Sequence, residues 1–211
     1  MSVAIAFDLF GTLVDADRPA DPAGAVASEL HERGVEVPAD WQAAYSEPHI
    51  DAPEGAEVPL PAHVSAALAS REVDTPNNAA RRAVVAAFDP IVETRDGARA
   101  AIEAAREYGP VGLLSNCSVP ELVGRTLIRS ELSRDEFDAV VSSVGCGWRK
   151  PHPQAFETLA GRLSVSVDEI SYIGDNPATD SGIEDCGGTY INVEACPLSE
   201  LPDRLETEVS G

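Results

Sequence analysis

The stretch VAIAFDLFGTLVD, residues 3–15, constrains the fold more than any other part of the chain. It is a short apolar run of residues that favour strands, and it ends at a single carboxylate, Asp8. Such a run predicts a strand buried on both faces, and Gly11 permits a sharp turn after it. Ligands bind at the carboxyl ends of strands in open α/β sheets. We therefore predict that Asp8 lies at the site of chemistry; an Asp that merely caps a turn is the plainer alternative.

The charge of the chain is extreme, with 36 acidic residues against 15 basic ones and a formal net charge of −21. The acids are spread along the whole chain, and Lys150 is the only lysine beside fourteen arginines. A dispersed acidic surface predicts a protein adapted to multimolar salt, where screening removes the self-repulsion. The 44% hydrophobic content excludes a disordered acidic chain. The lack of a basic patch argues against nucleic acid as a partner.

Localisation is predicted from features that the sequence lacks. No apolar run reaches the ~18 residues of a membrane-spanning helix. The chain begins directly with the predicted strand, without the basic segment and cleavage site of a signal peptide. The four cysteines show no CxxC pair and no zinc spacing, which fits free thiols in a reducing cytosol. We therefore predict a cytoplasmic protein without a membrane partner; no sequence feature indicates its oligomeric state.

Between Asp15 and Pro90 the sequence predicts helices only, several of them with proline in the first turn. These helices are predicted at residues 22–34, 38–45, 61–70 and 76–88, with a proline-rich loop at 49–61. The segment is the size of a small domain. We predict an all-helical insert, residues 16–90, placed after the first strand.

From residue 96 the pattern alternates between helices and strands, which predicts a doubly wound parallel sheet. The predicted helices are 96–108, 119–130, 153–163 and 179–186, and the further strands are 111–114, 137–142, 169–173 and 189–193. A short helix is also predicted in the acidic tail after Pro197. The predicted α/β core therefore comprises residues 1–15 and 91–211.

Polar groups follow the predicted strands at the points where the strands end. Asp8 follows the first strand, Ser115 and Asn116 the second, and Asp175 a later one, while Lys150 lies in the loop beyond the third. The carboxyl ends of parallel strands share one edge, so these groups can converge. Carboxylates, a hydroxyl and a fixed ammonium suit phosphoryl transfer, in which a carboxylate attacks phosphorus. A hard cation held by carboxylates would offset the accumulated negative charge.

Four segments in order, DLFGTL, LLSN, RKP and GDNPATD, resemble the motifs of the haloacid dehalogenase-like (HAD) hydrolases. The resemblance spans residues 3 to about 193, and the helical insert lies where that superfamily has a cap on its Rossmann-like core. It implies that Asp8 is the nucleophile, that Ser115 hydrogen-bonds the transferred group and that Lys150 neutralises it. It further implies an Mg²⁺ site formed by Asp8, the carbonyl of Phe10, Asp175 and, in support, Asp180. We predict that Thr12, Asn116 and Asn176 contact a small-molecule substrate.

Each of these residues also has an ordinary structural explanation. Ser115 could cap the next helix, Asp175 could be a turn residue, and Asp180 could lie on a solvated helix face. Trp148, beside the third motif, could line the pocket or be buried. Lys150 is harder to explain in this way, because a compact ammonium is kept in a chain whose other cations are all arginine.

Phe10 departs from the family's phosphatase pattern, in which the residue two after the nucleophile is usually a second Asp that acts as general acid and base. Phenylalanine cannot transfer a proton, and loss of such a group lowers rates by about 10²–10⁴-fold. One interpretation is a Mg²⁺-dependent phosphatase with a good leaving group or an acid supplied by the cap. The second is a metal-independent hydrolase of the 2-haloacid dehalogenase type, which has an aromatic residue at this position.

The fourth motif favours the first interpretation. GDNPATD resembles the metal-binding members of the superfamily rather than the dehalogenases. Carboxylates gathered near Asp8 would repel each other without a cation. We therefore predict a phosphatase that forms an aspartyl-phosphate intermediate on a small phosphorylated metabolite, with Mg²⁺ as cofactor. A catalytically silent binding protein with the HAD fold is a third possibility; it would explain Phe10 but not the retained Asp8 and Lys150.

Overall fold

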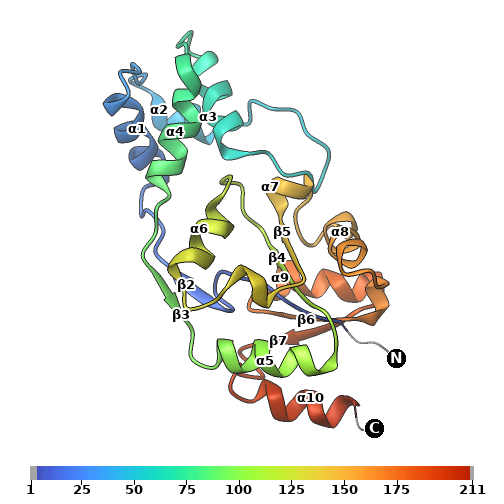
Figure 1. Cartoon of the computed structure of the whole chain (residues 1–211). Coiled ribbons are helices and arrows are strands. Elements are labelled where there is room, and N and C mark those ends of the chain that lie inside the picture. The colour runs from blue at the N-terminus through green and yellow to red at the C-terminus, as the bar shows by residue number, and fades with distance from the viewer. Residues whose placement is uncertain (1–3, 210–211) are drawn as a thin grey trace.

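The computed structural model describes residues 4–209, with side chains up to Leu205, and it is built around one parallel sheet (Figure 1). The sheet has five strands in the order β5-β4-β1-β6-β7. Their bounds are Ala4–Phe7 for β1, Val111–Ser115 for β4, Ala139–Ser142 for β5, Ile170–Gly174 for β6 and Thr189–Asn192 for β7. The predicted α/β fold with a parallel sheet is confirmed. Val3, the predicted start of the first strand, lies outside the described residues.

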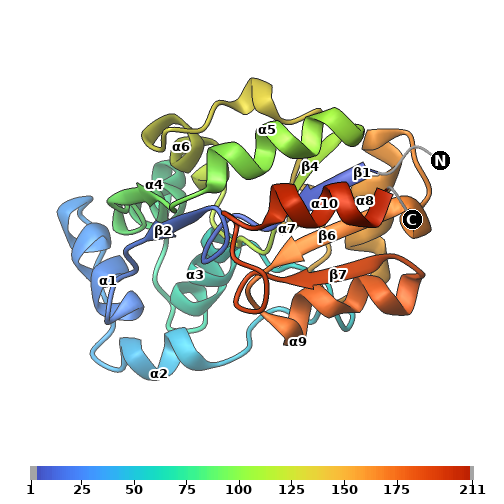
Figure 2. The same cartoon turned by 90° about the horizontal axis from the view of Figure 1, so that it is seen from below.

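Helices cover both faces of the sheet, as Figure 2 shows for α5 and α10 on one face and α8 on the other. The core helices are α5 (Ala98–Tyr108), α6 (Leu122–Arg129), α7 (Ser143–Cys146), α8 (Pro153–Leu163), α9 (Pro177–Asp180) and α10 (Leu201–Val209). Successive residues of β1 point to opposite faces of the sheet, because the side chains of a strand alternate between its two faces. Ile5 and Phe7 join the cluster that includes α5, while Ala4 and Ala6 join the cluster that includes α8.

The central strand β1 is buried along its whole length, which explains its uninterrupted apolar sequence. It pairs in parallel with β4 on one side and with β6 on the other, so that Phe7 is in register with Leu113 and Ile173. The chain runs outward from β1 in both directions, and a crevice forms at such a reversal of strand order. Asp8, the first residue after β1, therefore lies at this switch point of the sheet.

The helical insert consists of α1 (Pro22–Glu32), α2 (Trp41–Ser46), α3 (Leu60–Ala69) and α4 (Ala79–Ala87), which lie together at the top of Figure 1. The chain enters the insert through β2 (Val14–Ala16) and leaves it through β3 (Val92–Thr94), and these two strands pair antiparallel. Neither strand is among the elements predicted from the sequence. Each has only three residues, so neither carries a periodic pattern, and their pairing joins segments far apart in the chain.

A long loop, residues 47–59, leaves the insert and reaches down to the core beside α7 (Figure 1). Its backbone pairs with the segment that precedes Lys150: Glu57 N donates to the oxygen of Gly147 at 2.8 Å, and Arg149 N donates to that of Gly55 at 2.9 Å. The side chain of Glu57 is almost fully buried and accepts a hydrogen bond from the Ser143 hydroxyl. We call residues 47–59 the strap.

Several helix boundaries differ from the predictions: the helices predicted at 38–45 and 76–88 begin at Trp41 and Ala79, and two further differences have clear local reasons. The predicted helix 119–130 begins only at Leu122, because Glu121 has a left-handed conformation with φ 66°. The predicted helix 179–186 is a short α-helix from Pro177 to Asp180 followed by a 3-10 helix, and Asn176 caps its start by accepting from Ala178 N at 3.1 Å. Within residues 4–209 no helix is both long and apolar enough to cross a membrane.

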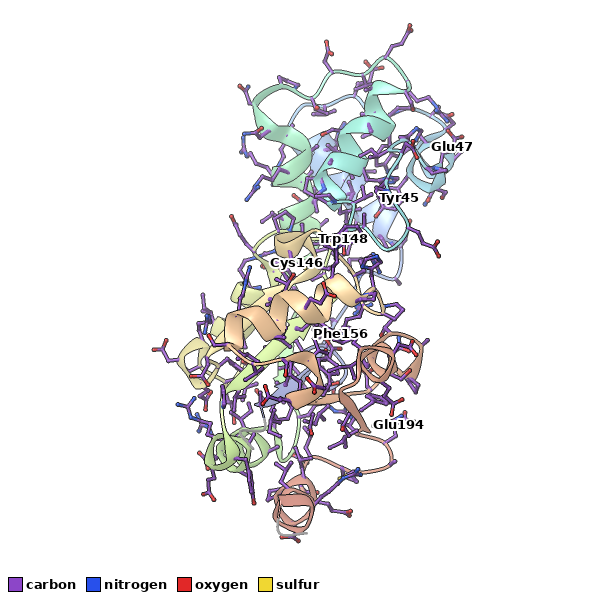
Figure 3. All side chains as sticks on the ribbon, turned by 90° about the vertical axis from the view of Figure 1, so that its right-hand side faces the viewer. Tyr45, Glu47, Cys146, Trp148, Phe156 and Glu194 are labelled. Atoms are coloured by element: carbon purple, nitrogen blue, oxygen red, sulfur yellow. The ribbon has the colours of Figure 1, made fainter. Side chains whose placement is uncertain are left out.

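The core is expected to be most sensitive at Phe156 of α8, labelled in Figure 3. Its side chain is fully buried. Its ring packs edge to face against that of Tyr172, with the ring centroids 5.6 Å apart. Phe156→Ala should therefore lower the free energy of unfolding by about 3–5 kcal/mol, measured by chemical denaturation at constant salt. The matched control is Ile128→Ala on α6, where the side chain is 85% exposed and the change should stay within about 0.5 kcal/mol. Equal losses for the two variants would contradict this account of the core.

Candidate active site

A tight turn after β1 places Asp8 at the carboxyl edge of the sheet. The carbonyl of Leu9 accepts hydrogen bonds from Leu13 N at 2.9 Å and from Val14 N at 3.0 Å, which closes the turn. Gly11 has φ +84°, and a Cβ at this position would come within 2.4 Å of an Asp175 carboxylate oxygen. Glycine is therefore required here both by the backbone conformation and by the close approach of Asp175.

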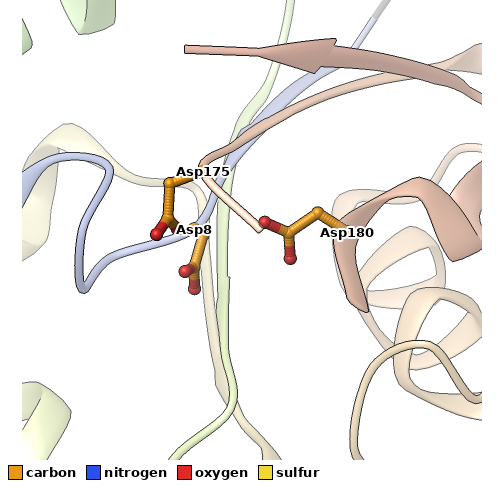
Figure 4. A group of neighbouring side chains, drawn as sticks. All are labelled: Asp8, Asp175 and Asp180. Carbon is orange, nitrogen blue, oxygen red and sulfur yellow. The ribbon is translucent and has the colours of Figure 1, made fainter. Parts of the chain in front are cut away.

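Three carboxylates converge at this edge, as Figure 4 shows for Asp8, Asp175 and Asp180. Each offers an oxygen within 4.8 Å of the others. Asp8 follows β1, Asp175 follows β6, and Asp180 is the last residue of α9. Asp180 is fully buried and Asp8 is 8% exposed, so the cluster lies largely out of solvent.

Lys150 supplies the positive charge inside this cluster. Its Nζ lies 2.7 Å from Asp180 Oδ1 and 3.1 Å from Asp8 Oδ1, and the residue is only 3% exposed. Nζ also donates to the Tyr172 hydroxyl at 2.6 Å, which in turn donates to the carbonyl of Leu114 at 2.6 Å. A buried ammonium is tolerated only when its donors are used in this way.

Asn116 holds the backbone around Lys150. Its side-chain amide donates to the carbonyl of Lys150 at 2.9 Å, and its side-chain oxygen accepts from Lys150 N at 2.8 Å. The loop after β4 is thereby fastened to the loop that carries the ammonium. Asn116 therefore has a structural role. It also lines a cavity beside the site, and its predicted contact with substrate stays a prediction.

The other predicted residues lie at the same edge. The Thr12 hydroxyl is fully buried and donates to Asp175 Oδ1 at 3.2 Å, so its described contact is with a carboxylate of the cluster. Ser115 ends β4, next to the central strand, and is 1% exposed. Asn176 is exposed and caps α9. The roles predicted for these residues stay predictions.

Burial raises the pKa of the Asp8 carboxyl above its ordinary value of 3.8. Lys150 opposes this rise, and the neighbouring charge of Asp180 adds to it. The pKa of Tyr172 lies well above its ordinary value of 10.0, chiefly because the side chain is buried and also because Asp8 and Asp180 are negative. Tyr172 therefore stays a neutral hydroxyl that accepts from Lys150 and donates to a carbonyl.

The donor set fits a hard divalent cation. Three carboxylates and one ammonium leave two negative charges, which is the charge that a divalent ion neutralises. Asp8 Oδ1 is buried and accepts no hydrogen bond from the described residues, although it is paired in charge with Lys150. Both oxygens of Asp180 are already occupied, one by Lys150 and the other by Asn176 N at 3.0 Å. Asp8 and Asp175 are thus the better candidates for direct ligands, with Asp180 behind them.

Four residues of the site are not among those predicted from the sequence: Tyr172, Arg18, Arg149 and Glu57. The only signal at Tyr172 is a hydroxyl in a largely apolar strand, which resembles an ordinary core residue. Arg18 and Arg149 line a cavity of about 190 Å³ together with Phe10, Asn116 and apolar side chains. Nothing in the local sequence distinguishes Arg18 from the other arginines, and Arg149 stands in the RKP motif without a role predicted for it. Trp148 is half-buried and stacks on His152 with ring centroids 4.2 Å apart; it is labelled in Figure 3.

Comparison with known proteins identifies the class. A family model described as haloacid dehalogenase-like hydrolase matches residues 3–187. The chain therefore belongs to the haloacid dehalogenase-like hydrolases, as the four motifs predicted. A phosphatase of Mycobacterium tuberculosis is 37% identical over 79 residues, which are 37% of this chain and 36% of the relative. The match thus spans about a third of the length of this curated relative.

Solved structures agree with the fold. A 2-haloacid dehalogenase from Pseudomonas syringae aligns with a TM-score of 0.65 at 16% identity, covering 99% of this chain and 100% of the other. A HAD family enzyme from Bacteroides thetaiotaomicron, solved with magnesium and inorganic phosphate, aligns with a TM-score of 0.59 at 14% identity over 90% and 93% of the two chains. At such identities the likeness shows the fold alone.

The raised pKa of Asp8 predicts a pH-dependent stability of the metal-free protein. The folded state binds the Asp8 proton more tightly than the unfolded chain does, so this group lowers the free energy of unfolding as the pH rises above 3.8. In EDTA, Asp8→Asn should therefore be more stable than the parent near pH 7. The difference should shrink as the pH is lowered towards about 4, as measured by chemical denaturation. A difference that grows on acidification would contradict the burial of an ionised Asp8.

Proposed function

We propose that the protein is a Mg²⁺-dependent phosphatase that acts on a small phosphorylated metabolite through an aspartyl-phosphate intermediate. The observation that carries the proposal is the convergence of Asp8, Asp175 and Asp180 on one buried ammonium, with two negative charges left over. A dehalogenase that works without metal has no use for this excess charge. The phosphatase among the curated relatives supports the same activity.

The chain's own groups suit both halves of such a reaction. A carboxylate oxygen of Asp8 attacks phosphorus, and the bond from phosphorus to the leaving oxygen breaks as the new one forms. Lys150, Ser115 and the backbone at the strand ends would hold the phosphoryl oxygens. Water then hydrolyses the acyl phosphate, which releases phosphate and restores Asp8. A bound Mg²⁺ would supply charge neutralisation to the phosphoryl group.

Phe10 leaves the departing oxygen without an acid at the usual position. Its backbone carbonyl is unaffected by the side chain and accepts no hydrogen bond within residues 4–209, which suits a metal ligand. Asp17 lines both cavities that flank Phe10, including the one that reaches Asp175. We infer that Asp17 is the carboxylate best placed to transfer the proton that the residue at position 10 would otherwise transfer.

The alternative is a metal-independent hydrolase of the 2-haloacid dehalogenase type. The aromatic side chain of Phe10 favours it, since expulsion of halide needs no proton. Asp8 would serve as nucleophile in this case too. A silent binding protein would retain the fold without turnover.

The wider assignments belong to the same proposal. Residues 1–15 and 91–211 would form the catalytic core and residues 16–90 the cap, with β2 and β3 connecting them. The single lysine and the net charge of −21 support a salt-rich cytoplasm as the place where the protein acts.

A panel of substrates with and without Mg²⁺ tests the proposal. In multimolar KCl the protein should hydrolyse an aryl phosphate. EDTA or Asp8→Asn should reduce the rate by about 10³-fold or more, because EDTA removes the cation and Asp8→Asn removes the nucleophile. The control is Arg82→Gln, an exposed residue of α4, which should behave as the parent. Turnover of 2-chloropropionate that persists in EDTA would support the dehalogenase instead, and no turnover on either substrate would support the binding protein.

Phe10→Asp tests what the missing acid does. The new carboxyl should protonate alkoxide leaving groups, so kcat/KM on alkyl phosphates should rise by about tenfold or more. Aryl phosphates, whose leaving groups need little protonation, should change far less. The matched control is Phe10→Asn, which has the same size but no titratable proton. An unchanged rate in Phe10→Asp, together with a loss in Asp17→Asn, would assign the proton transfer to Asp17.

A further inference from the structure

The cavity beside Phe10 has an unusual charge for this protein. Its charged lining consists of Arg18, Arg149 and Asp17, so two cations face one carboxylate in a chain with a net charge of −21. The adjoining cavity, of about 390 Å³, is lined by Asp15, Asp17, Glu93 and Asp175 against Arg18 alone. An anionic group next to the site is therefore favoured only in the first cavity.

Arg18 is held over the site by Phe10. The guanidinium carbon of Arg18 lies 5.9 Å from the centre of the Phe10 ring, within the range of a cation–π contact. Arg18 lies two residues after the end of β2, so it comes from the beginning of the insert. No hydrogen bond or ion pair to another described residue uses its guanidinium, which leaves the fork open towards a ligand.

Arg149 is held from the other side by the strap. Its Nη1 lies 3.3 Å from Glu57 Oε1, and the Glu57 side chain is only 1% exposed. The other oxygen of Glu57 accepts from Ser143, whose own oxygen accepts from Cys117 N at 2.7 Å. A buried carboxylate with fixed partners thus anchors one nitrogen of Arg149, while its side chain stays 50% exposed at the cavity.

We propose that Arg18 and Arg149 form a subsite for a second oxyanion of the substrate. This inference rests on the proposed phosphatase function and narrows its substrate to a phosphate ester whose leaving group ends in a carboxylate or a further phosphate. Guanidinium forks match both groups. The remaining lining is apolar, with Phe88, Val119 and Leu122, and about 190 Å³ holds roughly six groups the size of water. The leaving group is therefore short and partly apolar.

The test separates this subsite from the catalytic activity. Asp8→Asn serves as the background, so that ligands bind without turnover, and calorimetry is done with MgCl₂ at the lowest salt that keeps the protein folded. The ligands are phosphoglycolate, ethyl phosphate as its counterpart without the carboxylate, and ethanediol bisphosphate as the probe for a second phosphate. Phosphoglycolate or the bisphosphate should bind about tenfold more tightly than ethyl phosphate.

Arg18→Gln and Arg149→Gln should each reduce this preference several-fold, and the double variant should abolish it. Arg82→Gln, which changes an exposed arginine outside the cavity, should leave it intact. Equal affinity for ligands with and without the second anionic group in the background protein, or a preference that survives the double variant, would overturn the subsite. If the active protein hydrolyses no phosphate ester but the preference still depends on the two arginines, the subsite stands and the proposed phosphatase function fails.

Discussion

The buried ammonium of Lys150 is the interaction on which the arrangement of the site depends. It touches a carboxylate at the end of β1, a carboxylate at the end of α9 and a hydroxyl from inside the sheet, so it joins parts of the chain that share no local structure. Without it, Asp180 would be a fully buried and uncompensated charge, which proteins do not tolerate well. The same contact leaves the cluster two charges short of neutrality. The stability of the site and the proposed affinity for a divalent cation thus have one origin.

Phe10 shows that one residue can act separately through its backbone and its side chain. The carbonyl belongs to the turn that presents Asp8, and any residue would supply it. The ring has lost the proton-transfer role expected at this position, but it supports Arg18 instead. The fold and the charge balance therefore do not depend on the residue type at this position, whereas in the proposed reaction the choice of leaving group does.

Much of this architecture could be predicted from local sequence. Asp8, Ser115 and Asp175 follow buried apolar strands, and parallel strands bring their carboxyl ends to one edge, so their convergence follows from topology alone. Tyr172 could not be recognised in this way, because a buried tyrosine in a strand looks like core until its distant partner Lys150 is known. The strands β2 and β3 are too short to show a period, and Glu57 is meaningful only because the strap reaches the core.

The strap has a consequence for how the two parts of the molecule can move. Two connections through β2 and β3 would form a simple hinge, and the insert could swing as a rigid body. The strap adds a third crossing through the backbone bonds of Glu57 and Arg149, and Leu60 N, at the start of α3, donates to the carbonyl of Ser118 at 2.9 Å. Opening must therefore either break the bonds of the strap or leave the strap behind on the core, and in both cases it must break other contacts of the helices with the core, such as the hydrogen bond from Arg125 Nη1 to the carbonyl of Val85 at 3.1 Å. In the second case the wall next to Lys150 stays on the core, and only the Arg18 side of the cavity moves with the insert.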